Sequence, residues 1–457
     1  MKKVLIYNWS HVDDMIGGGV TVYVQNLINA LIESGKYKVT YLNSGWTYDK
    51  TKRVYIRKVE NQFNSLLESY ELVNSPVLAP IEQCAENLRI YLEDKSLLPV
   101  INEFIEENNG FDVIHFNNLE GISLDVLRLK EKHPDTKIIY SLHNYFPFCS
   151  KVNLWQNGNT DYPHNCSKTS YNECVDCYKT NAYFTTVIKR RNTTIATRAF
   201  SRVVNTLFQD RGNGELYRAF TEENVKQINK YVDLVLAVSE RVAEIACRYG
   251  ISNEKIRVSY IGTKVAEYAQ YIANSRYDGN TFKIVYMGYM RPDKGYYFLM
   301  DCLDRLPDKY AEKIEVSIVA RYNAKKNQKE LDQLQDLRKK FKNINLINGY
   351  TPKNQKELLQ GMTLGIVPVL WEDNLPQVAI EQIAYGVPIL VSDLGGAKEL
   401  CGDRRFVFKA GDFADFTNKL VYIIEHPETL DEYWGKVMDL RTVDKHFVEI
   451  NKYYQQS

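Results

Sequence analysis

The sequence predicts an α/β protein with two domains, each built on a doubly wound parallel sheet, and three observations support this. Short apolar runs typical of buried strands alternate with amphipathic segments typical of helices along the chain. The chain has 457 residues, more than one hydrophobic core usually supports. Its content of 44% hydrophobic and 25% charged residues is that of an ordinary globular protein.

Two sets of strands are expected, one in each domain. The first set comprises 3–7, 38–42, 112–116, 137–143 and 234–239. The second set comprises 283–288, 316–320, 344–348, 364–370 and 388–392. A polar stretch places the domain boundary between about Thr263 and Gly279. The resulting divisions are 1–270, 271–430 and 431–457, the last with a helix from Glu432 to Tyr454.

Composition excludes some partners and locations. A net charge of +1 argues against a broad nucleic-acid-binding surface. The sequence has no run of about eighteen apolar residues, and its start lacks the apolar core and cleavage site of a signal peptide. We therefore expect a cytoplasmic protein.

A glycine cluster precedes the first predicted helix. Gly17, Gly18 and Gly19 lie directly before a segment with apolar residues at helical spacing. Glycines let backbone N–H groups approach a ligand, and a helix N-terminus favours an anion. The pattern is not a dinucleotide-binding fingerprint, because Gly-x-Gly-x-x-Gly and a downstream ribose-binding acid are absent. A ligand-binding loop and a simple glycine turn both remain open.

Two cations follow a strand of the second domain. Arg291 and Lys294 lie between the strand at 283–288 and a helix whose apolar residues begin near Phe298. Fixed cations at the end of a strand suit a diphosphate leaving group, because negative charge grows there as the bond breaks. The alternative is a solvated basic loop.

Two acids lie between the last two strands predicted for the second domain. Asp373 and Glu381 are separated by seven residues, and a helix is expected from about Gln377 to a stop at Gly386. One acid is therefore on a loop after a strand and the other inside a helix, where ligands of open α/β sheets bind. A carboxylate accepts two hydrogen bonds, as a ribose or hexose diol requires. Otherwise both acids are ordinary helix charges.

The segment 367–396 resembles the family-four retaining glycosyltransferases, also described as glycosyl transferases group 1. Their signature is an acid, seven residues and a Glu, followed here by the small-Gly-x-Pro and Asp-x-Gly-Gly turns. Asp373 stands where the family usually has Glu. The resemblance implies the GT-B fold, in which two Rossmann-like domains face each other across a cleft. It also implies that the final helix crosses back onto the first domain.

The resemblance assigns roles to residues of the second domain. Glu381 would bind the ribose and Asp373 the transferred sugar. Glu372 is one residue out of register and is expected to point away. Lys294 keeps the family's Lys-Gly ending and would contact the diphosphate, while Arg291 lies two residues after the usual arginine position, which Tyr289 occupies. Further donor contacts are expected from Asn374, Leu375 and Gln377, the last two through backbone N–H groups.

The first domain would contribute a histidine and the glycine loop. His143 matches the histidine of the family's Thr-x-His-Asp segment, with Asn144 in place of the Asp. It would donate a hydrogen bond to a sugar hydroxyl or stabilise developing charge. Gly18 and Gly19 would lie beneath the donor diphosphate. His115 is a second candidate, near the acceptor.

The region 149–177 is rich in cysteine. Cys174 and Cys177 have the spacing of a metal-binding knuckle, and Cys149 and Cys166 complete a set of four. In a cytosolic protein, zinc is favoured over disulfides. Two interpretations stay open, a structural zinc ion and reduced, unliganded thiols.

The expected function is therefore transfer of a sugar, with retention, from a UDP- or GDP-sugar to a hydroxyl of a glycan or lipid-linked glycan in polysaccharide synthesis. No metal is expected to be required for catalysis. Alternatives are a nucleotide-sugar epimerase of the same fold and a non-catalytic nucleotide- or glycan-binding module. The basic region 179–231, including Lys189, Arg190 and Arg191, is either exposed helix surface or a contact with the inner face of an anionic membrane.

Overall fold

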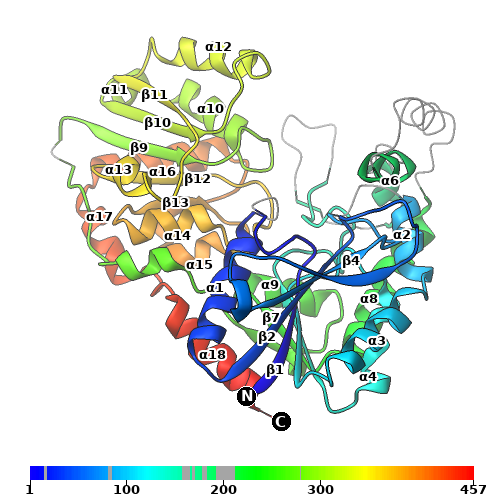
Figure 1. The fold of residues 1–457 in the computed structure, drawn as a ribbon. Coiled ribbons are helices and arrows are strands. Elements are labelled where there is room, and N and C mark those ends of the chain that lie inside the picture. The colour runs from blue at the N-terminus through cyan, green and yellow to red at the C-terminus, as the bar shows by residue number, and fades with distance from the viewer. Residues whose placement is uncertain are drawn as a thin grey trace. The chain divides into compact units, whose positions relative to one another are not determined.

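The computed structural model describes residues 1–14, 18–80, 85–156, 165–166, 170–177, 183–191, 212–277 and 279–456. The chain divides into two compact units (Figure 1). Unit 1 comprises Met1–Leu154, Cys166–Ile261 and Val443–Ser457, and unit 2 comprises Trp155–Asn165 and Gly262–Thr442.

Unit 1 is built on an 8-stranded sheet with the order β3-β4-β2-β1-β5-β6-β7-β8. All neighbouring strands are parallel except β3 and β4, which are antiparallel. The strands are β1 (Lys2–Tyr7), β2 (Tyr37–Ser44), β3 (Tyr55–Val59), β4 (Glu68–Val73), β5 (Val113–Phe116), β6 (Lys137–Leu142), β7 (Leu234–Ala237) and β8 (Ile256–Val258).

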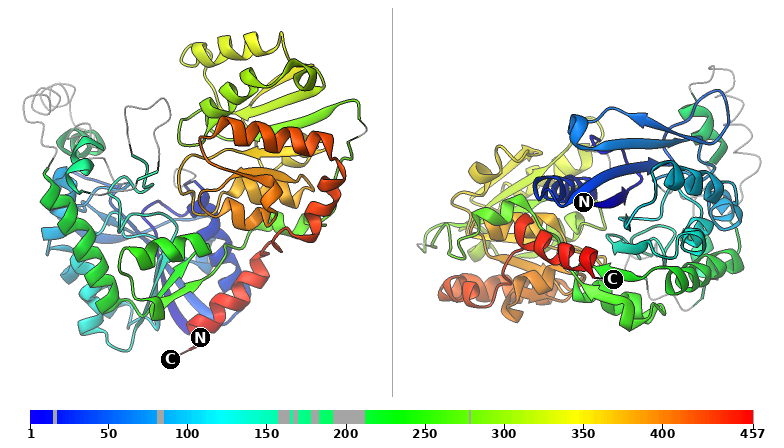
Figure 2. Two further views of the ribbon diagram at one scale, coloured as in Figure 1. Left: turned by 180° about the vertical axis from the view of Figure 1, so that it is seen from behind. Right: turned by 60° about the horizontal axis from the view of Figure 1, so that its bottom comes forward.

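Helices cover both faces of this sheet, with α1 and α18 on one face and α3 and α8 on the other (Figures 1 and 2). The N-termini of α8 and α9 are capped by Asn213 and Ser239, whose side chains accept backbone N–H bonds from Leu216 and Val242. The α-helices are α1 (Gly19–Glu33), α2 (Ala85–Glu93), α3 (Leu97–Glu107), α4 (Leu129–Lys132), α5 (Asn172–Cys177), α6 (Tyr183–Arg190), α8 (Gly214–Tyr231), α9 (Glu240–Arg248) and α18 (Val443–Gln455).

Unit 2 has a 6-stranded, fully parallel sheet with the order β11-β10-β9-β12-β13-β14. Its strands are β9 (Phe282–Met287), β10 (Ile314–Ala320), β11 (Asn343–Asn348), β12 (Leu364–Val367), β13 (Ile389–Ser392) and β14 (Val407–Phe408). Its α-helices are α10 (Tyr296–Arg305), α11 (Asp308–Ala311), α12 (Gln328–Leu337), α13 (Gln355–Leu359), α14 (Gln377–Ala384), α15 (Ala397–Cys401), α16 (Phe413–Glu425) and α17 (Glu428–Glu432).

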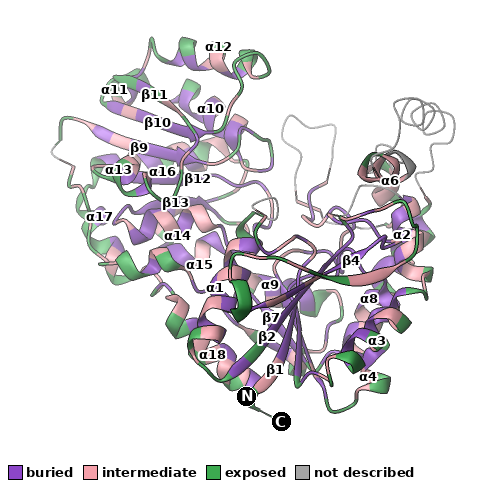
Figure 3. Ribbon diagram, viewed as in Figure 1, coloured by how far each residue is buried: buried purple, intermediate pink, exposed green. Residues whose placement is uncertain are grey.

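The cores of both sheets consist of short, wholly buried strands (Figure 3). All residues of β5, β7, β12 and β13 are buried. Strands that are covered on both faces need apolar side chains on both, which explains the continuous apolar runs. This confirms the predicted α/β class with two parallel-sheet domains.

Several boundaries differ from those predicted. The chain passes from unit 1 to unit 2 after Ile261 and returns after Thr442. The helix expected from Glu432 to Tyr454 is interrupted: α17 ends at Glu432, and α18 begins only at Val443. Between them the backbone bonds to other elements, since Met438 N–H donates to the Leu400 carbonyl and Leu440 N–H to the Tyr271 hydroxyl.

Candidate active site

The two acids of unit 2 lie where the sequence predicted, at the carboxyl end of β12 and inside the next helix. Asp373 is on the loop between β12 and α14 and is 8% exposed. Glu381 is in α14, which ends before Gly386, a glycine with a φ of 75°. A left-handed glycine after the last helical residue is a common helix stop.

Lys294 donates a hydrogen bond to Asp373, with 2.6 Å between Nζ and Oδ2. The loops that carry them are fastened together. A Cβ on Gly295 would lie only 1.7 Å from the Pro368 carbonyl oxygen, so only glycine allows this approach. Leu370 N–H also donates to the Asp293 carbonyl at 3.0 Å. The cation and the acid are therefore held together by backbone as well as by charge.

Arg291 is paired with a different acid. Its Nε and Nη2 donate to the two carboxylate oxygens of Asp293 at 2.9 and 2.7 Å. This fork-to-fork pairing fixes the guanidinium against its own loop. Of the two predicted cations, only Lys294 contacts an acid of the motif.

Glu372, the neighbour of Asp373, is 1% exposed. Its Oε2 accepts the backbone N–H of Gly395 at 2.8 Å, and its Oε1 accepts from Asn165 Nδ2 at 2.8 Å. A Cβ on Gly395 would lie 2.1 Å from the Asp373 carbonyl oxygen. Glu372 therefore braces the loop beside Asp373 instead of pointing away into solvent.

Glu381 has a partner that sequence reasoning did not find. The Tyr350 hydroxyl, two residues after β11, donates to Glu381 Oε2 at 2.7 Å. Burial raises the pKa of Glu381, and hydrogen bonds from Tyr350 and Gln355 partly counter this rise. Because a carboxylate can accept about four hydrogen bonds in all, Glu381 keeps acceptor capacity for hydroxyl groups.

The loop between the acids also carries a buried amide. Asn374 is 5% exposed, and its Nδ2 has no hydrogen-bond partner among the residues that the structure describes. An unsatisfied buried donor costs about 1–3 kcal/mol. A ligand with acceptor oxygens would satisfy it. Leu375 and Gln377 occupy the approach to α14 and its first residue, as predicted.

In unit 1, His143 follows β6 and is half-buried. Its Nε2 lies 3.2 Å from Asn117 Oδ1, while Asn117 Nδ2 donates to the Tyr7 carbonyl. Burial, followed by the nearby His446, lowers the pKa of His143 to about 3. The ring is therefore neutral and carries its proton on Nε2, which leaves Nδ1 as an acceptor. This reverses the expected direction of the hydrogen bond to a sugar hydroxyl.

His115 cannot serve as the second ligand-binding histidine. Its side chain is fully buried, its Nδ1 lies 2.7 Å from the Tyr454 hydroxyl, and its Nε2 lies 2.8 Å from Ser141 Oγ. Both ring nitrogens are engaged inside the fold. The pattern that suggested a ligand contact, a histidine ending a strand, also fits a buried network.

The glycine loop is described in part. Gly17 lies outside the described residues, Gly18 has a φ of 59°, and Gly19 begins α1. A Cβ on Gly18 would meet nothing within 4 Å. The backbone conformation at Gly18 therefore favours glycine, and the surrounding space is open.

The four predicted zinc ligands are half-buried, and none forms a disulfide with another described cysteine. Burial raises the pKa of Tyr249, and the nearby thiols of Cys166, Cys149 and Cys174 raise it further. Three of the four cysteines therefore lie near one tyrosine. Within the described ranges, no group of three or more His, Cys, Asp or Glu is arranged to hold a metal ion. The zinc ion stays a prediction.

The basic region is described only around α6 and from Gly212 onward. The Arg190 guanidinium lies 4.4 Å from the Trp46 ring centroid, and that of Arg191 lies 5.7 Å from the Tyr48 ring centroid. These cations pack on aromatic rings. No helix in the described part of the chain is long and apolar enough to cross a membrane.

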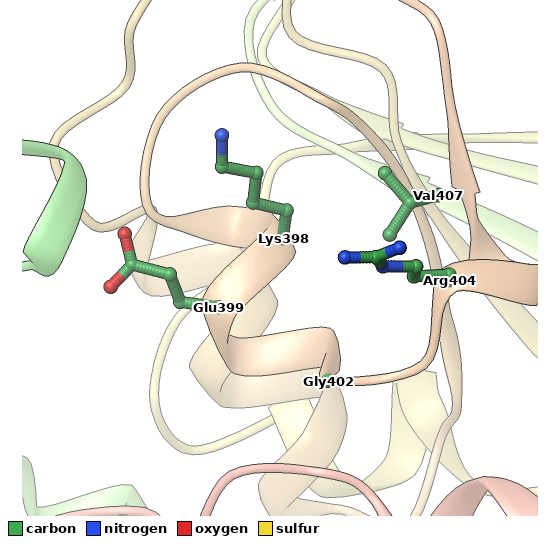
Figure 4. Close-up of a pocket in the computed structure, with 5 residues that line it drawn as sticks. All are labelled: Lys398, Glu399, Gly402, Arg404 and Val407. Carbon is green, nitrogen blue, oxygen red and sulfur yellow. The ribbon is translucent and has the colours of Figure 1, made fainter.

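A separate hollow of about 430 Å³ lies on unit 2, lined by Lys398, Glu399, Gly402, Arg404 and Val407. In Figure 4 the Arg404 guanidinium points back toward α15, whereas Glu399 points away from it. None of the predicted site residues lines this hollow, so it is distinct from the acid motif.

The acid motif lies within a segment of the chain that matches the model of a known protein family. The model for glycosyl transferases group 1 matches residues 281–426. This range contains both loops described above, with Lys294, Asp373 and Glu381. Among curated proteins, no sequence matches this chain.

Solved structures with the same fold cover the whole chain. Sucrose-phosphate synthase from Thermosynechococcus elongatus is 14% identical with a TM-score of 0.63, over 100% of this chain and 99% of that one. Anabaena HepE in complex with UDP-glucose is 14% identical with a TM-score of 0.56, over 99% of each chain. The lipopolysaccharide outer core galactosyltransferase WaaB is 12% identical with a TM-score of 0.57, over 99% and 98%. Residues 281–426 thus match the glycosyl transferases group 1 model, and the chain as a whole has the two-domain GT-B fold.

Proposed function

We propose that this chain transfers a sugar, with retention of configuration, from a nucleotide-sugar donor to a hydroxyl of a glycan or lipid-linked glycan. The observation that carries the proposal is the hydrogen-bonded pair of Lys294 and Asp373. Asp373 lies on the loop after β12, and Glu381 lies in α14, the helix that follows this loop. The arrangement supplies a cation for phosphate and two acceptors for sugar hydroxyls. HepE, a structural relative, binds UDP and UDP-glucose.

Each residue has a role that its geometry supports. Glu381 accepts hydrogen bonds from the ribose diol with the acceptor capacity that remains beside the bond from Tyr350. Lys294 exchanges its bond to Asp373 for the donor diphosphate, where it stabilises the charge of the leaving group. Asp373 then accepts from hydroxyls of the transferred sugar, and His143 accepts another through Nδ1.

The proton balance requires no side-chain nucleophile. As the glycosidic bond breaks, the leaving phosphate oxygen takes the proton of the acceptor hydroxyl on the same face of the sugar. Lys294 supplies positive charge to that phosphate, so the reaction proceeds without a catalytic metal ion. Arg291 remains bonded to Asp293 and shapes the loop.

The test begins with a thermal-shift screen of the UDP-, GDP-, ADP- and dTDP-sugars. The donor that stabilises the protein most is then incubated with and without oligosaccharide and lipid-linked acceptors, and products are separated by mass spectrometry. Transfer that depends on an acceptor and is lost in Asp373→Asn supports the proposal. Acceptor-independent release of altered sugar indicates an epimerase, and binding without any product indicates a binding module; either result contradicts it.

A lipid-linked acceptor would place the reaction at the cytoplasmic face of a membrane. Flotation with liposomes that contain anionic phospholipid tests this part separately. Association that disappears at high salt supports it. Equal recovery with neutral and anionic liposomes contradicts it and leaves the transfer reaction unaffected.

A further inference from the structure

The ring of His143 rests on a tyrosine that is held by the far end of the chain. The ring centroids of Tyr23 in α1 and His143 are 4.5 Å apart, with an angle of 54° between the planes. The Tyr23 hydroxyl lies 3.0 Å from Nε2 of His446 in α18. Tyr23 is 3% exposed and His446 is 4% exposed. The contact is therefore sealed from water.

A second set of hydrogen bonds also involves α18. The Ser141 side chain lies near the Tyr23 hydroxyl, whose pKa it lowers, and Ser141 Oγ lies 2.8 Å from His115 Nε2. His115 Nδ1 in turn lies 2.7 Å from the hydroxyl of Tyr454. His446 and Tyr454 both belong to α18, so this helix anchors both ends of a network that includes β5, β6 and α1.

Two members of the network, His115 and Tyr23, are neutral at ordinary pH. Burial lowers the pKa of His115 to about 3, and the neighbouring His143 and His446 contribute to that shift. Burial also raises the pKa of Tyr23. Hydrogen bonds between such buried groups hold the side chains in one orientation.

His143 has two constraints on its orientation. Its Nε2–H donates to Asn117 Oδ1, and the ring packs against Tyr23 in a tilted arrangement. With only the hydrogen bond, the ring could pivot about the Nε2 contact. The contact with the Tyr23 ring restricts that rotation and therefore the direction in which Nδ1 points.

We propose that Tyr23 and His446 are positioning residues for His143, so that α18 fixes the direction of the Nδ1 lone pair. The inference rests on the proposed function, in which His143 contacts the transferred sugar. A group that must meet a sugar hydroxyl loses efficiency when it is displaced, and about 1 Å of misplacement can cost on the order of 100-fold in rate. The final helix thus contributes to the site through Tyr23.

Tyr23→Phe is the direct test, because it removes the hydroxyl and keeps the ring. Tyr37→Phe is the matched control: the Tyr37 hydroxyl donates to Asn451 in the same helix at 2.8 Å, and its ring packs on Tyr454 rather than on His143. Tyr37→Phe loses two hydrogen bonds to α18, those with Asn451 and Gln455, whereas Tyr23→Phe loses the one with His446. The melting temperature of Tyr37→Phe should therefore fall at least as far as that of Tyr23→Phe. Only Tyr23→Phe is expected to change His143.

The first measurement is the nitrogen NMR spectrum of protein labelled at its seven histidines, assigned with His143→Ala. In the wild type and in Tyr37→Phe, His143 is expected to show one neutral tautomer, with the proton on Nε2. In Tyr23→Phe its signals should shift or broaden. Unchanged His143 signals in Tyr23→Phe overturn the inference, whatever the donor of the enzyme is.

The second measurement is turnover with whichever of UDP-, GDP-, ADP- and dTDP-glucose gives the largest thermal shift. Tyr23→Phe should lower kcat about tenfold with little change in KM, and His446→Gln, which keeps a polar partner for Tyr23, should be milder than His446→Leu. Equal kcat in Tyr23→Phe and Tyr37→Phe overturns the inference while the proposed function stands. Wild-type kcat in His143→Ala removes the role of His143 itself, on which the inference depends.

Discussion

The acid loop of unit 2 and the histidine network of unit 1 use polar groups in opposite ways. Lys294 and Asp373 are charged, and their side chains are 27% and 11% exposed, so each can exchange its partner for a ligand. His115 and Tyr23 are buried and neutral, and their bonds are satisfied within the fold. The partly exposed charged pair is suited to a charged ligand, as proposed above, and the buried neutral groups are suited to holding side chains in one orientation.

The largest effect is expected at Lys294. Lys294→Ala should lower kcat about 100-fold, because a lost charge-assisted contact to a leaving group is not replaced by water. Arg291→Ala should be much milder, because that guanidinium already pairs with Asp293. Steady-state kinetics at saturating donor compare the two variants. A near-normal kcat for Lys294→Ala would remove the leaving-group role.

The next largest effects separate the two acids. Glu381→Ala should mainly weaken donor binding, because the ribose contact is equal in the ground and transition states. Asp373→Ala should lower kcat more than affinity, because the transferred sugar gains positive charge. Calorimetric titration alongside turnover distinguishes the two. A larger loss of donor affinity in Asp373→Ala than in Glu381→Ala would contradict the assignment.

Glu372 provides a comparison between bracing and binding. Because its carboxylate holds Gly395 and Asn165, Glu372→Ala should lower the melting temperature and reduce kcat together. Glu372→Gln keeps one acceptor oxygen and should recover part of both. If Glu372→Ala abolished activity at full stability while Asp373→Ala behaved as wild type, the motif would be misaligned by one residue.

A smaller effect, on the stability of the fold, is expected when the pH is lowered. An unfolded histidine gains its proton below about pH 6.5, whereas His115 in the fold stays neutral to about 3. The unfolded state therefore binds more protons in that interval, and stability falls as the pH is lowered through it. At pH 5 the loss from His115 alone is about 2 kcal/mol. Denaturant titrations should show that the free energy of unfolding of His115→Asn depends less steeply on pH than that of the wild type. The same pH dependence in both proteins would contradict the account.

The smallest effect on turnover is expected from the cysteines. If the predicted zinc is present, elemental analysis should find about one ion per chain, and mild chelation should leave kcat unchanged because the ion is structural. Cys174→Ser together with Cys177→Ser should lower the zinc content. Substoichiometric zinc that the double variant does not change would remove the metal and leave reduced thiols as the explanation.

The central strands could be predicted from the sequence because short, continuous apolar runs are typical of buried strands. Sequence reasoning missed β3 and β4, whose residues include Arg57, Lys58 and Glu68, because strands toward the edge of a sheet tolerate charge. The spacing of Asp373 and Glu381 placed both acids correctly on a loop and a helix. Spacing could not supply their partners.

Long-range pairing explains what could not be predicted. Tyr23 and His446 are separated by 423 positions, and Tyr350 reaches Glu381 from another strand. No local pattern marks such pairs, and a histidine at a strand end fits both a ligand contact and a buried bond. His115 and His143 share that signal, and only the structure shows that His115 is fully buried whereas His143 is half-buried.

The central claim is that the Lys294 side of unit 2 binds the nucleotide diphosphate. Calorimetric titration of UDP, GDP, ADP and dTDP into Lys294→Met and Lys398→Met tests it most directly, because Lys398 lines the separate hollow of unit 2. We expect the nucleotide that binds the wild type to lose at least about tenfold in affinity with Lys294→Met and to bind Lys398→Met normally. Normal binding to Lys294→Met with weakened binding to Lys398→Met would contradict the account.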